Sequence, residues 1–273
     1  MGVTVTSDGF ICSKRDLNLE STLECGQFFR YFKKDDGSYI AASGDKTCHL
    51  YYDGESVRGI TDYPEYFVRY FDFDTDYDGI IKSLGGFTEL SEPLSVAAGL
   101  RILRQQPFET TVSFIISANN NIGRIRGIIE RLCTKCGAMG KSGTYAFPTR
   151  ESMLALSCED YRALGCGFRS EYLYDTVPKL TDEFLSGIGE LSHDDALKKL
   201  CTLKGIGPKV AECILLFAYK MTASYPVDTW IFKAGKTDEL NTPKKVGEYY
   251  MTRYGEYAGY AQQYIFEYSR KHK

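Results

Sequence analysis

Two predicted helices joined by a glycine-rich turn constrain this chain more than any other feature of its sequence. In HDDALKKLCTLKGIGPKVAECILLFAY, residues 193–219, apolar residues recur three and four apart on both sides of Lys204-Gly205-Ile206-Gly207-Pro208. Ser192 followed by Asp195 is typical of the start of a helix, and a proline is tolerated in the first turn of the next one. The segment therefore predicts a helix-hairpin-helix.

The turn of this hairpin is suited to bind a phosphate. Gly205 and Gly207 allow a tight turn whose backbone N–H groups face outward, and Ile206 can fill the gap between the helices. Exposed amides at a helix N-terminus bind anions, and a DNA phosphate fits there without base contacts. A plain corner between two helices also uses glycine, so the hairpin alone leaves both interpretations open.

A lysine and an aspartate follow this turn at a distinctive spacing. Lys209 lies in the first turn of its helix, where the helix dipole disfavours an ammonium and a half-buried lysine suits an amine nucleophile. Phosphate binding is its simpler role. Nineteen residues later, Asp228 lies at the predicted N-cap of the next helix, where it either caps alone or keeps a carboxylate near a reaction centre.

Together, the run GIGPKVAEC at 205–213 and Pro226-Val227-Asp228 resemble the helix-hairpin-helix DNA glycosylases, and among them the 8-oxoguanine DNA glycosylase family. The resemblance implies that Lys209 attacks the sugar C1′ and that Asp228 assists. Relatives that only release a base lack the lysine, so Lys209 implies a Schiff base and lyase activity at the abasic site. The implied partner is double-stranded DNA containing oxidised guanine, with a preference for cytosine opposite the lesion.

Two further motifs resemble the parts of this family that recognise the lesion base. LECGQFFRY implies that the carbonyl of Gly26 distinguishes 8-oxoguanine from guanine, and YAGYAQQYIF implies that Gln262 meets the pairing edge while Phe266 stacks on the base. The resemblance puts Cys213 on the opposite side of the base. Gln262 and Phe266 share one helix face because they are four residues apart, which an ordinary amphipathic helix would also explain.

The motifs SFIISANNNIGRI and LGCGFR resemble the elements that enter the duplex. They imply that Asn119 fills the hole left by the extruded base, Arg124 and Arg169 bind the orphan cytosine, and Phe168 wedges into the DNA. On the residues alone, three consecutive asparagines indicate a turn. Core packing for Phe168 and a solvated charge for Arg169 are the corresponding alternatives.

One position departs from the family pattern. Two residues after Asp228, eukaryotic relatives have a histidine that meets a phosphate, and this chain has Trp230. The resemblance implies that any phosphate contact there is weaker or made by the ring nitrogen of Trp230. The matching motifs otherwise span residues 23–266, which is nearly the whole chain.

Charge and cysteine content set limits on partners and compartment. Lys and Arg total 33 against 36 Asp and Glu, a net charge of −3, so DNA contact requires a local basic patch. Nine cysteines without a regular framework, and no apolar run of membrane-spanning length, predict a reducing compartment and no membrane partner. We expect an intracellular monomer, cytoplasmic and nucleoid-associated if the source is a prokaryote.

We expect no metal site and no required cofactor. Cys133-Thr-Lys-Cys136 is a CxxC that would suit zinc or redox chemistry, but it has no second cysteine pair, and two thiols on a helix explain it as well. Backbone carbonyls of the hairpin leave room for a bound monovalent cation.

The hydrophobic pattern changes along the chain and predicts an α+β fold, an N-terminal antiparallel β region packed on a larger helical body. We expect a β domain over 1–95 and a helical glycosylase domain over 96–273 whose C-terminal helix completes the base pocket. The expected strands are Gln27–Phe32, Tyr39–Ala42 and Cys48–Tyr52, and the expected helices are Val112–Ser117, Ile122–Cys133, Ser152–Leu156, Glu171–Leu185 and Asp194–Leu203. Two alternatives to excision of 8-oxoguanine are a glycosylase for another oxidised or alkylated purine and a non-catalytic DNA-binding module.

Overall fold

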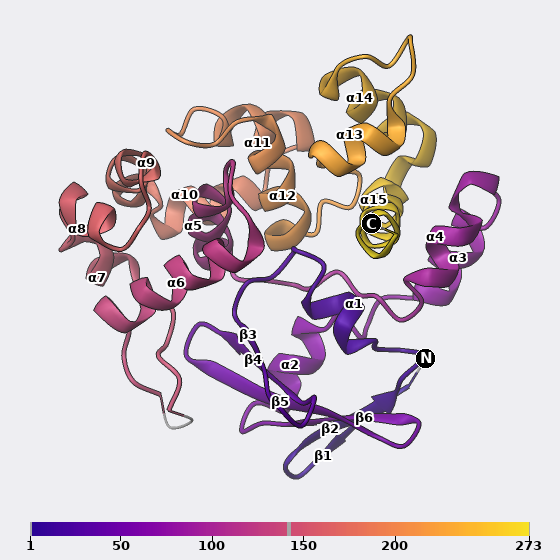
Figure 1. Cartoon of the computed structure of the whole chain (residues 1–273), viewed down its shortest axis with the longest axis horizontal. Helices are drawn as coiled ribbons and strands as arrows, with labels where there is room; N and C mark the ends of the chain where they lie inside the picture. Colours follow the sequence, from indigo (N-terminus) through magenta and orange to yellow (C-terminus); the bar gives the residue numbers. More distant parts are fainter. Residues whose placement is uncertain (1, 141–142, 273) are drawn as a thin grey trace.

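The computed structural model describes residues 2–140 and 143–272. Its N-terminal part is one antiparallel sheet of order β1-β2-β6-β5-β4-β3, and its remainder is helical (Figure 1). The strands are β1 (Val3–Thr6), β2 (Gly9–Ser13), β3 (Tyr31–Lys33), β4 (Tyr39–Ser43), β5 (Lys46–Asp53) and β6 (Ser56–Ile60). The predicted α+β class is confirmed.

The helices run through the rest of the chain. They are α1 (Leu19–Leu23), α2 (Pro64–Tyr70), α3 (Tyr77–Leu84), α4 (Ser91–Val96), α5 (Pro107–Ser117), α6 (Ile122–Cys136), α7 (Arg150–Leu154), α8 (Cys158–Ala163), α9 (Arg169–Thr176), α10 (Asp182–Gly189), α11 (His193–Leu200), α12 (Pro208–Tyr219), α13 (Thr229–Gly235), α14 (Pro243–Tyr254) and α15 (Ala258–Lys271), with short 3-10 turns at Thr88–Leu90, Val177–Lys179 and Gly255–Tyr257. No helix within 2–140 or 143–272 has the length and apolar character that a membrane crossing requires.

The sheet ends earlier than the sequence pattern indicates. The predicted β region reaches residue 95, but strand β6 ends at Ile60 and α2, α3 and α4 follow. The buried aromatic residues of α2, Phe67 and Tyr70, belong to the same buried cluster as the strand residues Phe10 and Leu50. Aromatic residues are common both in strands and in hydrophobic cores. The sequence of this segment therefore resembles that of a strand, although the segment forms a helix that covers the sheet.

Each predicted helix overlaps a helix of the structure, but the predicted Ser152–Leu156 and Asp194–Leu203 end later than α7 and α11, and one predicted helix is broken. The expected helix Glu171–Leu185 is two helices, α9 and α10, separated by a 3-10 turn that contains Pro178. Proline lacks an N–H and clashes with the preceding helical turn, and Thr181 then caps α10 by accepting a hydrogen bond from the Phe184 N–H. The predicted strand at 27–32 is also shorter, since β3 begins at Tyr31.

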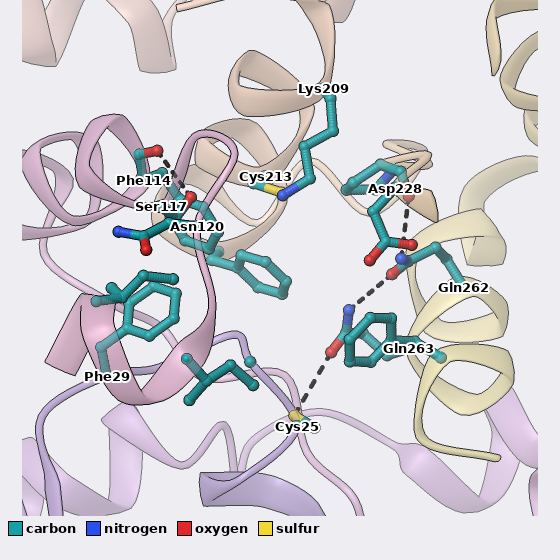
Figure 2. Close-up of a pocket in the computed structure, with 16 residues that line it drawn as sticks. Cys25, Phe29, Phe114, Ser117, Asn120, Lys209, Cys213, Asp228, Gln262 and Gln263 are labelled. Carbon is teal, nitrogen blue, oxygen red and sulfur yellow. Dashed lines mark hydrogen bonds between the residues drawn. The ribbon is translucent and has the colours of Figure 1, made fainter. Parts of the chain in front are cut away.

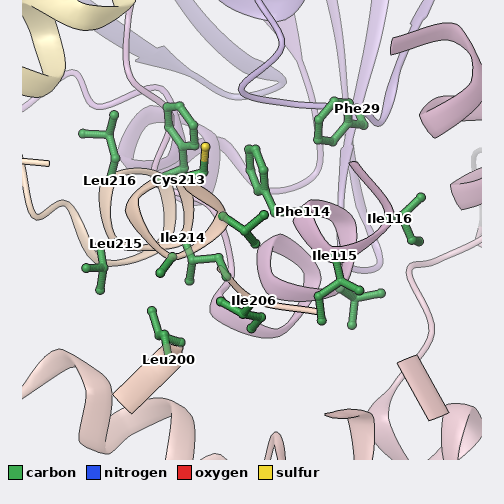
Figure 3. Packing of buried hydrophobic residues seen from close by; sticks show 14 of the residues in the cluster. Phe29, Phe114, Ile115, Ile116, Leu200, Ile206, Cys213, Ile214, Leu215 and Leu216 are labelled. Atoms are coloured by element: carbon green, nitrogen blue, oxygen red, sulfur yellow. The ribbon is translucent and has the colours of Figure 1, made fainter. Parts of the chain in front are cut away.

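The larger core lies between α5, α12 and the helices around them (Figure 3). The rings of Phe114 on α5 and Phe217 on α12 stack with centroids 5.5 Å apart. A polar contact joins the sheet region to this helical body. Glu109 of α5 accepts a hydrogen bond from the Gly44 N–H at 2.7 Å. Helices α5 and α12 therefore pack directly against each other, and both present residues to the pocket described next.

Candidate active site

A pocket of about 130 Å³ lies where the N-terminal region, α5, α12 and α15 meet (Figure 2). It brings together residues more than 200 positions apart in the sequence. Its lining is Cys25, Gly26, Phe29, Phe114, Ser117, Asn120, Ile122, Ile125, Lys209, Cys213, Phe217, Pro226, Asp228, Gln262, Gln263 and Phe266. Six of the residues that the sequence predicts for catalysis and lesion recognition, namely Gly26, Lys209, Cys213, Asp228, Gln262 and Phe266, are all among them.

Lys209 reaches this pocket from the first turn of α12 and is half-buried. Its Nζ lies 5.6 Å from the ring centroid of Phe114. Cys213 is one helical turn further along α12, and burial raises the pKa of its thiol, while the neighbouring Lys209 ammonium opposes that rise. The thiol is thus a neutral, buried group beside the amine of Lys209, and both face the pocket from α12.

Asp228 is the N-cap of α13, as its position in the sequence predicts. Its Oδ1 accepts hydrogen bonds from the backbone N–H groups of Trp230 at 3.0 Å and Ile231 at 2.9 Å. Both donors fix the carboxylate at the pocket wall that faces Lys209 (Figure 2). Trp230 is half-buried on the same helix, and Lys233 Nζ lies 5.8 Å from the centroid of its ring.

The hairpin has the predicted geometry, with α11 ending at Leu200 rather than near Leu203. Gly205 has φ of +85°, and a Cβ at this position would lie 2.6–2.7 Å from atoms of the Tyr172 side chain. Gly207 is exposed with no other atom within 4 Å of its Cβ position. Ile206 is 4% exposed and fills the space between the helices as predicted (Figure 3). Gly205 therefore sets the turn, and Gly207 leaves its outer face open.

The wall opposite Lys209 contains the predicted lesion-recognition residues. Gly26 has φ of +81°, and a Cβ there would meet Ile122 and Phe266 at 3.6 and 3.7 Å, which are ordinary contact distances. The left-handed backbone, rather than crowding, requires glycine at this position. Gln262 is 3% exposed and donates from Nε2 to the Pro226 carbonyl at 3.0 Å.

The residues predicted to enter the duplex lie on neighbouring turns. The Asn119–Asn121 run forms the predicted turn: Asn119 has φ of +50°, and Asn121 caps α6 by accepting from the Arg124 N–H. Asn119 and Arg124 are exposed, and Arg124 Nη2 lies 3.4 Å from the Gly165 carbonyl oxygen. Phe168 is 51% exposed, so the core-packing alternative for it is wrong.

Arg169 has a different environment from its neighbours. It is 2% exposed, and its guanidinium donates to the carbonyls of Ala118 at 2.7 Å, Asn119 at 2.7 Å and Cys166 at 3.2 Å. The alternative of a solvated surface charge is therefore wrong. In this structure Arg169 joins the start of α9 to the asparagine turn, and a direct contact with cytosine stays a prediction.

The CxxC motif lies at the end of α6. Cys133 is buried, and burial raises the pKa of its thiol to about 12. Cys136 donates to the Leu132 carbonyl on the same helix. Across the described part of the chain, no three His, Cys, Asp or Glu residues are grouped so that they could hold a metal ion. These observations favour the interpretation of two thiols carried by a helix.

Sequence reasoning missed several residues of the pocket. Gln263 is 3% exposed and lines it beside Gln262, as do Cys25, Phe114 and Asn120. Successive residues on a helix are rotated by about 100°, so Gln262 and Gln263 point in different directions. A simple amphipathic pattern, with one apolar and one polar face, would assign only one of them to the pocket. The sequence contains one indication that Gln263 also lines the pocket: a second glutamine directly follows the first in a largely apolar stretch of the helix.

Comparison with known proteins agrees with this geometry. A family model described as HhH-GPD superfamily base excision DNA repair protein matches residues 112–254, and one described as 8-oxoguanine DNA glycosylase, N-terminal domain, matches residues 9–111. The chain belongs to the HhH-GPD superfamily of base excision DNA repair proteins. Residues 9–111, which contain the sheet, are similar to the N-terminal domain of the 8-oxoguanine DNA glycosylases.

Curated relatives include the N-glycosylase/DNA lyase OGG1 of Arabidopsis thaliana, 35% identical over 66% of this chain and 54% of the relative. The match to this plant protein thus spans about half of its length. A probable N-glycosylase/DNA lyase of Methanothermobacter thermautotrophicus is 30% identical over 79% of each chain. The Clostridium acetobutylicum 8-oxoguanine glycosylase/lyase, solved with double-stranded DNA containing cytosine opposite 8-oxoG, is 32% identical, covers 100% of this chain and 98% of its own, and has a TM-score of 0.92.

Proposed function

We propose that this protein excises 8-oxoguanine from double-stranded DNA, preferably opposite cytosine, and then cleaves the abasic site as a lyase. The observation that carries the proposal is that Lys209 and Asp228 line the same pocket as Gly26, Gln262 and Phe266. An amine, a carboxylate and a base-sized recess with a flat aromatic wall are what displacement of a flipped base requires. The names of the relatives agree with this activity.

In this mechanism Lys209 acts as the nucleophile. Asp228 helps to activate Lys209 by favouring loss of its ammonium proton. The free amine then attacks C1′, the bond from C1′ to the base breaks, and the base leaves with the bonding electrons and takes up a proton. Asp228 stabilises the cationic character that develops on the sugar, for which its fixed carboxylate is suited. Loss of the amine proton and opening of the sugar ring give an imine, and β-elimination then breaks the bond to the 3′ phosphate.

The remaining predicted residues supply DNA contacts in this proposal. Gly205 and Gly207 present hairpin amides to a phosphate, and Trp230 lies where a second phosphate contact is expected. Asn119, Arg124 and Phe168 are exposed: Asn119 fills the space that the flipped base leaves, Arg124 binds the orphan cytosine, and Phe168 wedges into the duplex. Because the substrate is duplex DNA, we propose that the protein acts inside the cell, beside the nucleoid if the source is a prokaryote, and as a monomer.

We propose that the reaction requires no metal or organic cofactor, because a lysine amine supplies the nucleophile. A monovalent cation on the hairpin carbonyls stays a prediction. Two of those carbonyls already have partners, since that of Leu203 accepts from the Ile206 N–H at 3.2 Å and that of Lys204 accepts from the Thr176 hydroxyl at 2.8 Å.

Borohydride trapping on an 8-oxoguanine:cytosine duplex tests the proposal, with Lys209→Gln as the comparison. We expect a covalent protein–DNA band that the variant lacks. A band that persists in the variant would move the nucleophile to another residue. Binding of the duplex without a band from either protein would instead favour a different lesion or a non-catalytic DNA-binding module.

A further inference from the structure

Three side chains form a hydrogen-bonded chain across the floor of the pocket (Figure 2). The Cys25 thiol lies 3.7 Å from Gln263 Oε1, and Gln263 Nε2 donates to Gln262 Oε1 at 2.6 Å. Gln262 Nε2 in turn donates to the Pro226 carbonyl at 3.0 Å. All three side chains are buried, with Cys25 1% exposed and the two glutamines 3% exposed.

The chemistry of the two ends fixes the direction of this chain. The Pro226 carbonyl can only accept, so it requires the Gln262 amide nitrogen on its side and leaves Gln262 Oε1 toward Gln263. Burial raises the pKa of the Cys25 thiol to about 12, so this end of the chain is a protonated donor. Reversing the Gln263 amide would bring its oxygen against Gln262 Oε1 and lose the hydrogen bond between the two glutamines.

The orientation of Gln262 decides which purines the pocket can bind. A carbonyl oxygen has two lone pairs, and Gln263 uses one of those on Gln262 Oε1. The other lone pair can accept a hydrogen bond from a base. The pairing edge of guanine carries N–H donors at ring N1 and the 2-amino group, whereas adenine has a lone pair at N1 that would face this oxygen unfavourably.

We propose that Gln263 is a positioning residue that holds the Gln262 amide with its oxygen available to the base. The pocket then selects purines with an N–H at ring N1 and rejects those with a lone pair there. This inference rests on the proposed function and adds to it the residue that sets selectivity along the pairing edge. Gln263 itself acts through Gln262 rather than on the reacting atoms.

Gln263→Met is a suitable variant because methionine has a similar shape and the substitution takes away the donor to Gln262 Oε1. The Cys25 thiol still has the Thr22 carbonyl 3.5 Å away, and Gln262 keeps its bond to Pro226. The variant therefore removes one of the two contacts that orient the Gln262 amide and leaves Gln262 Oε1 without a protein donor. Gln105→Met is the matched control, since Gln105 donates from Nε2 to a backbone carbonyl, that of Gln27, at 2.7 Å and does not line the pocket.

The experiment compares single-turnover excision of 8-oxoguanine and 8-oxoadenine, each placed opposite cytosine, by the wild-type chain and the two variants. Both bases carry the N7–H that Gly26 would meet, so only the pairing edge differs. Incision of a preformed abasic site needs no base recognition, because that site contains no base. Its rate measures the amount of protein with an active Lys209, and each excision rate is divided by it. We expect the ratio of 8-oxoguanine to 8-oxoadenine excision to fall about tenfold in Gln263→Met and to stay unchanged in Gln105→Met.

The outcomes separate the two proposals. If the wild-type chain excises no 8-oxoguanine, the proposed function is wrong and this inference is wrong with it. If the wild-type chain excises 8-oxoguanine but Gln263→Met keeps the wild-type ratio, only the positioning role is wrong. An equal fall in both variants would show a general loosening of the fold and would also overturn the role of Gln263.

Discussion

The carboxylate of Asp228 accepts a hydrogen bond from the backbone N–H of Ile231 at 2.9 Å, so one residue both begins α13 and faces Lys209 across the pocket. Capping needs only a side-chain oxygen, whereas stabilising a cationic sugar needs the negative charge. These two contributions can therefore be separated by substitution.

Asp228→Asn should retain the cap and lose the charge. Asparagine caps about as well as aspartate, so we expect the free energy of unfolding to change by less than about 0.5 kcal/mol. Excision should slow by about 100-fold or more, which is the usual contribution of such a group. Denaturant melts and single-turnover rates measure the two effects, and a wild-type rate would exclude Asp228 from the chemistry.

Gly205→Ala should destabilise the fold much more than Gly207→Ala. A Cβ at residue 205 would have an unfavourable φ and would clash with Tyr172, so we expect a loss of about 3 kcal/mol of stability. At residue 207 the space is open, and we expect a change within about 1 kcal/mol. There the methyl group projects from the phosphate-binding face. Gel shifts on undamaged duplex should show weaker binding by a folded Gly207→Ala protein, and unaltered affinity would argue against the hairpin contact.

Arg124→Ala should relax the preference for the opposite base. Its side chain is exposed and has one long contact to the Gly165 carbonyl, so stability should change by less than about 0.5 kcal/mol. We expect excision opposite cytosine and opposite adenine to become more alike while 8-oxoguanine remains the preferred lesion. The measurement is the ratio of rates on the two duplexes, and a ratio equal to that of the wild-type chain would contradict the assignment.

Arg169→Ala should act mainly through the fold. The substitution removes three hydrogen bonds from a buried guanidinium and leaves the carbonyls of Ala118 and Asn119 without this donor. We expect a loss of about 3 kcal/mol of stability, seen as a lower melting temperature. A melting temperature like that of Arg124→Ala would show that the bonds contribute little to stability.

His193→Gln should flatten the dependence of stability on pH. His193 Nε2 pairs with Glu212 Oε2 at 3.1 Å, and this bond raises the pKa of His193, with Asp194 contributing less. The protonated pair therefore stabilises the fold fully below pH 6.5, the ordinary histidine value, and the benefit is lost as the pH rises through the elevated pKa. Melting temperatures from pH 5.5 to about 8.5 measure this dependence of stability on pH.

His49→Gln, which removes a contact to Ser38, is the control. An equal slope in His193→Gln and the wild-type chain would contradict the prediction.

Features with a local cause were predictable from the sequence. The cap at Asp228, the turn at Asn119–Asn121 and the buried Ile206 depend on residues within a few positions, and all three are present in the structure. The break at Pro178 is local too, but helical spacing across it concealed the effect of the proline.

Features that depend on distant residues were not predictable in this way. The environment of Arg169 is set by carbonyls about 50 positions earlier, and nothing near Arg169 in the sequence indicates them. The role of Gln263 depends on Cys25, which is 238 residues away. The helix α2 was mistaken for part of the β region because its aromatic residues suit either structure until the sheet that they cover is known.

The contact between Cys25 and Gln263 also has a consequence for the order of assembly during synthesis. The hairpin and Lys209 are translated before α15, which supplies Gln262, Gln263 and Phe266. A growing chain can therefore fold the hairpin and place Lys209 before residues 258–271 have been made. Until α15 packs in place, the recess beside Gly26 lacks the wall that Gln262, Gln263 and Phe266 form, so the pocket is completed after the hairpin.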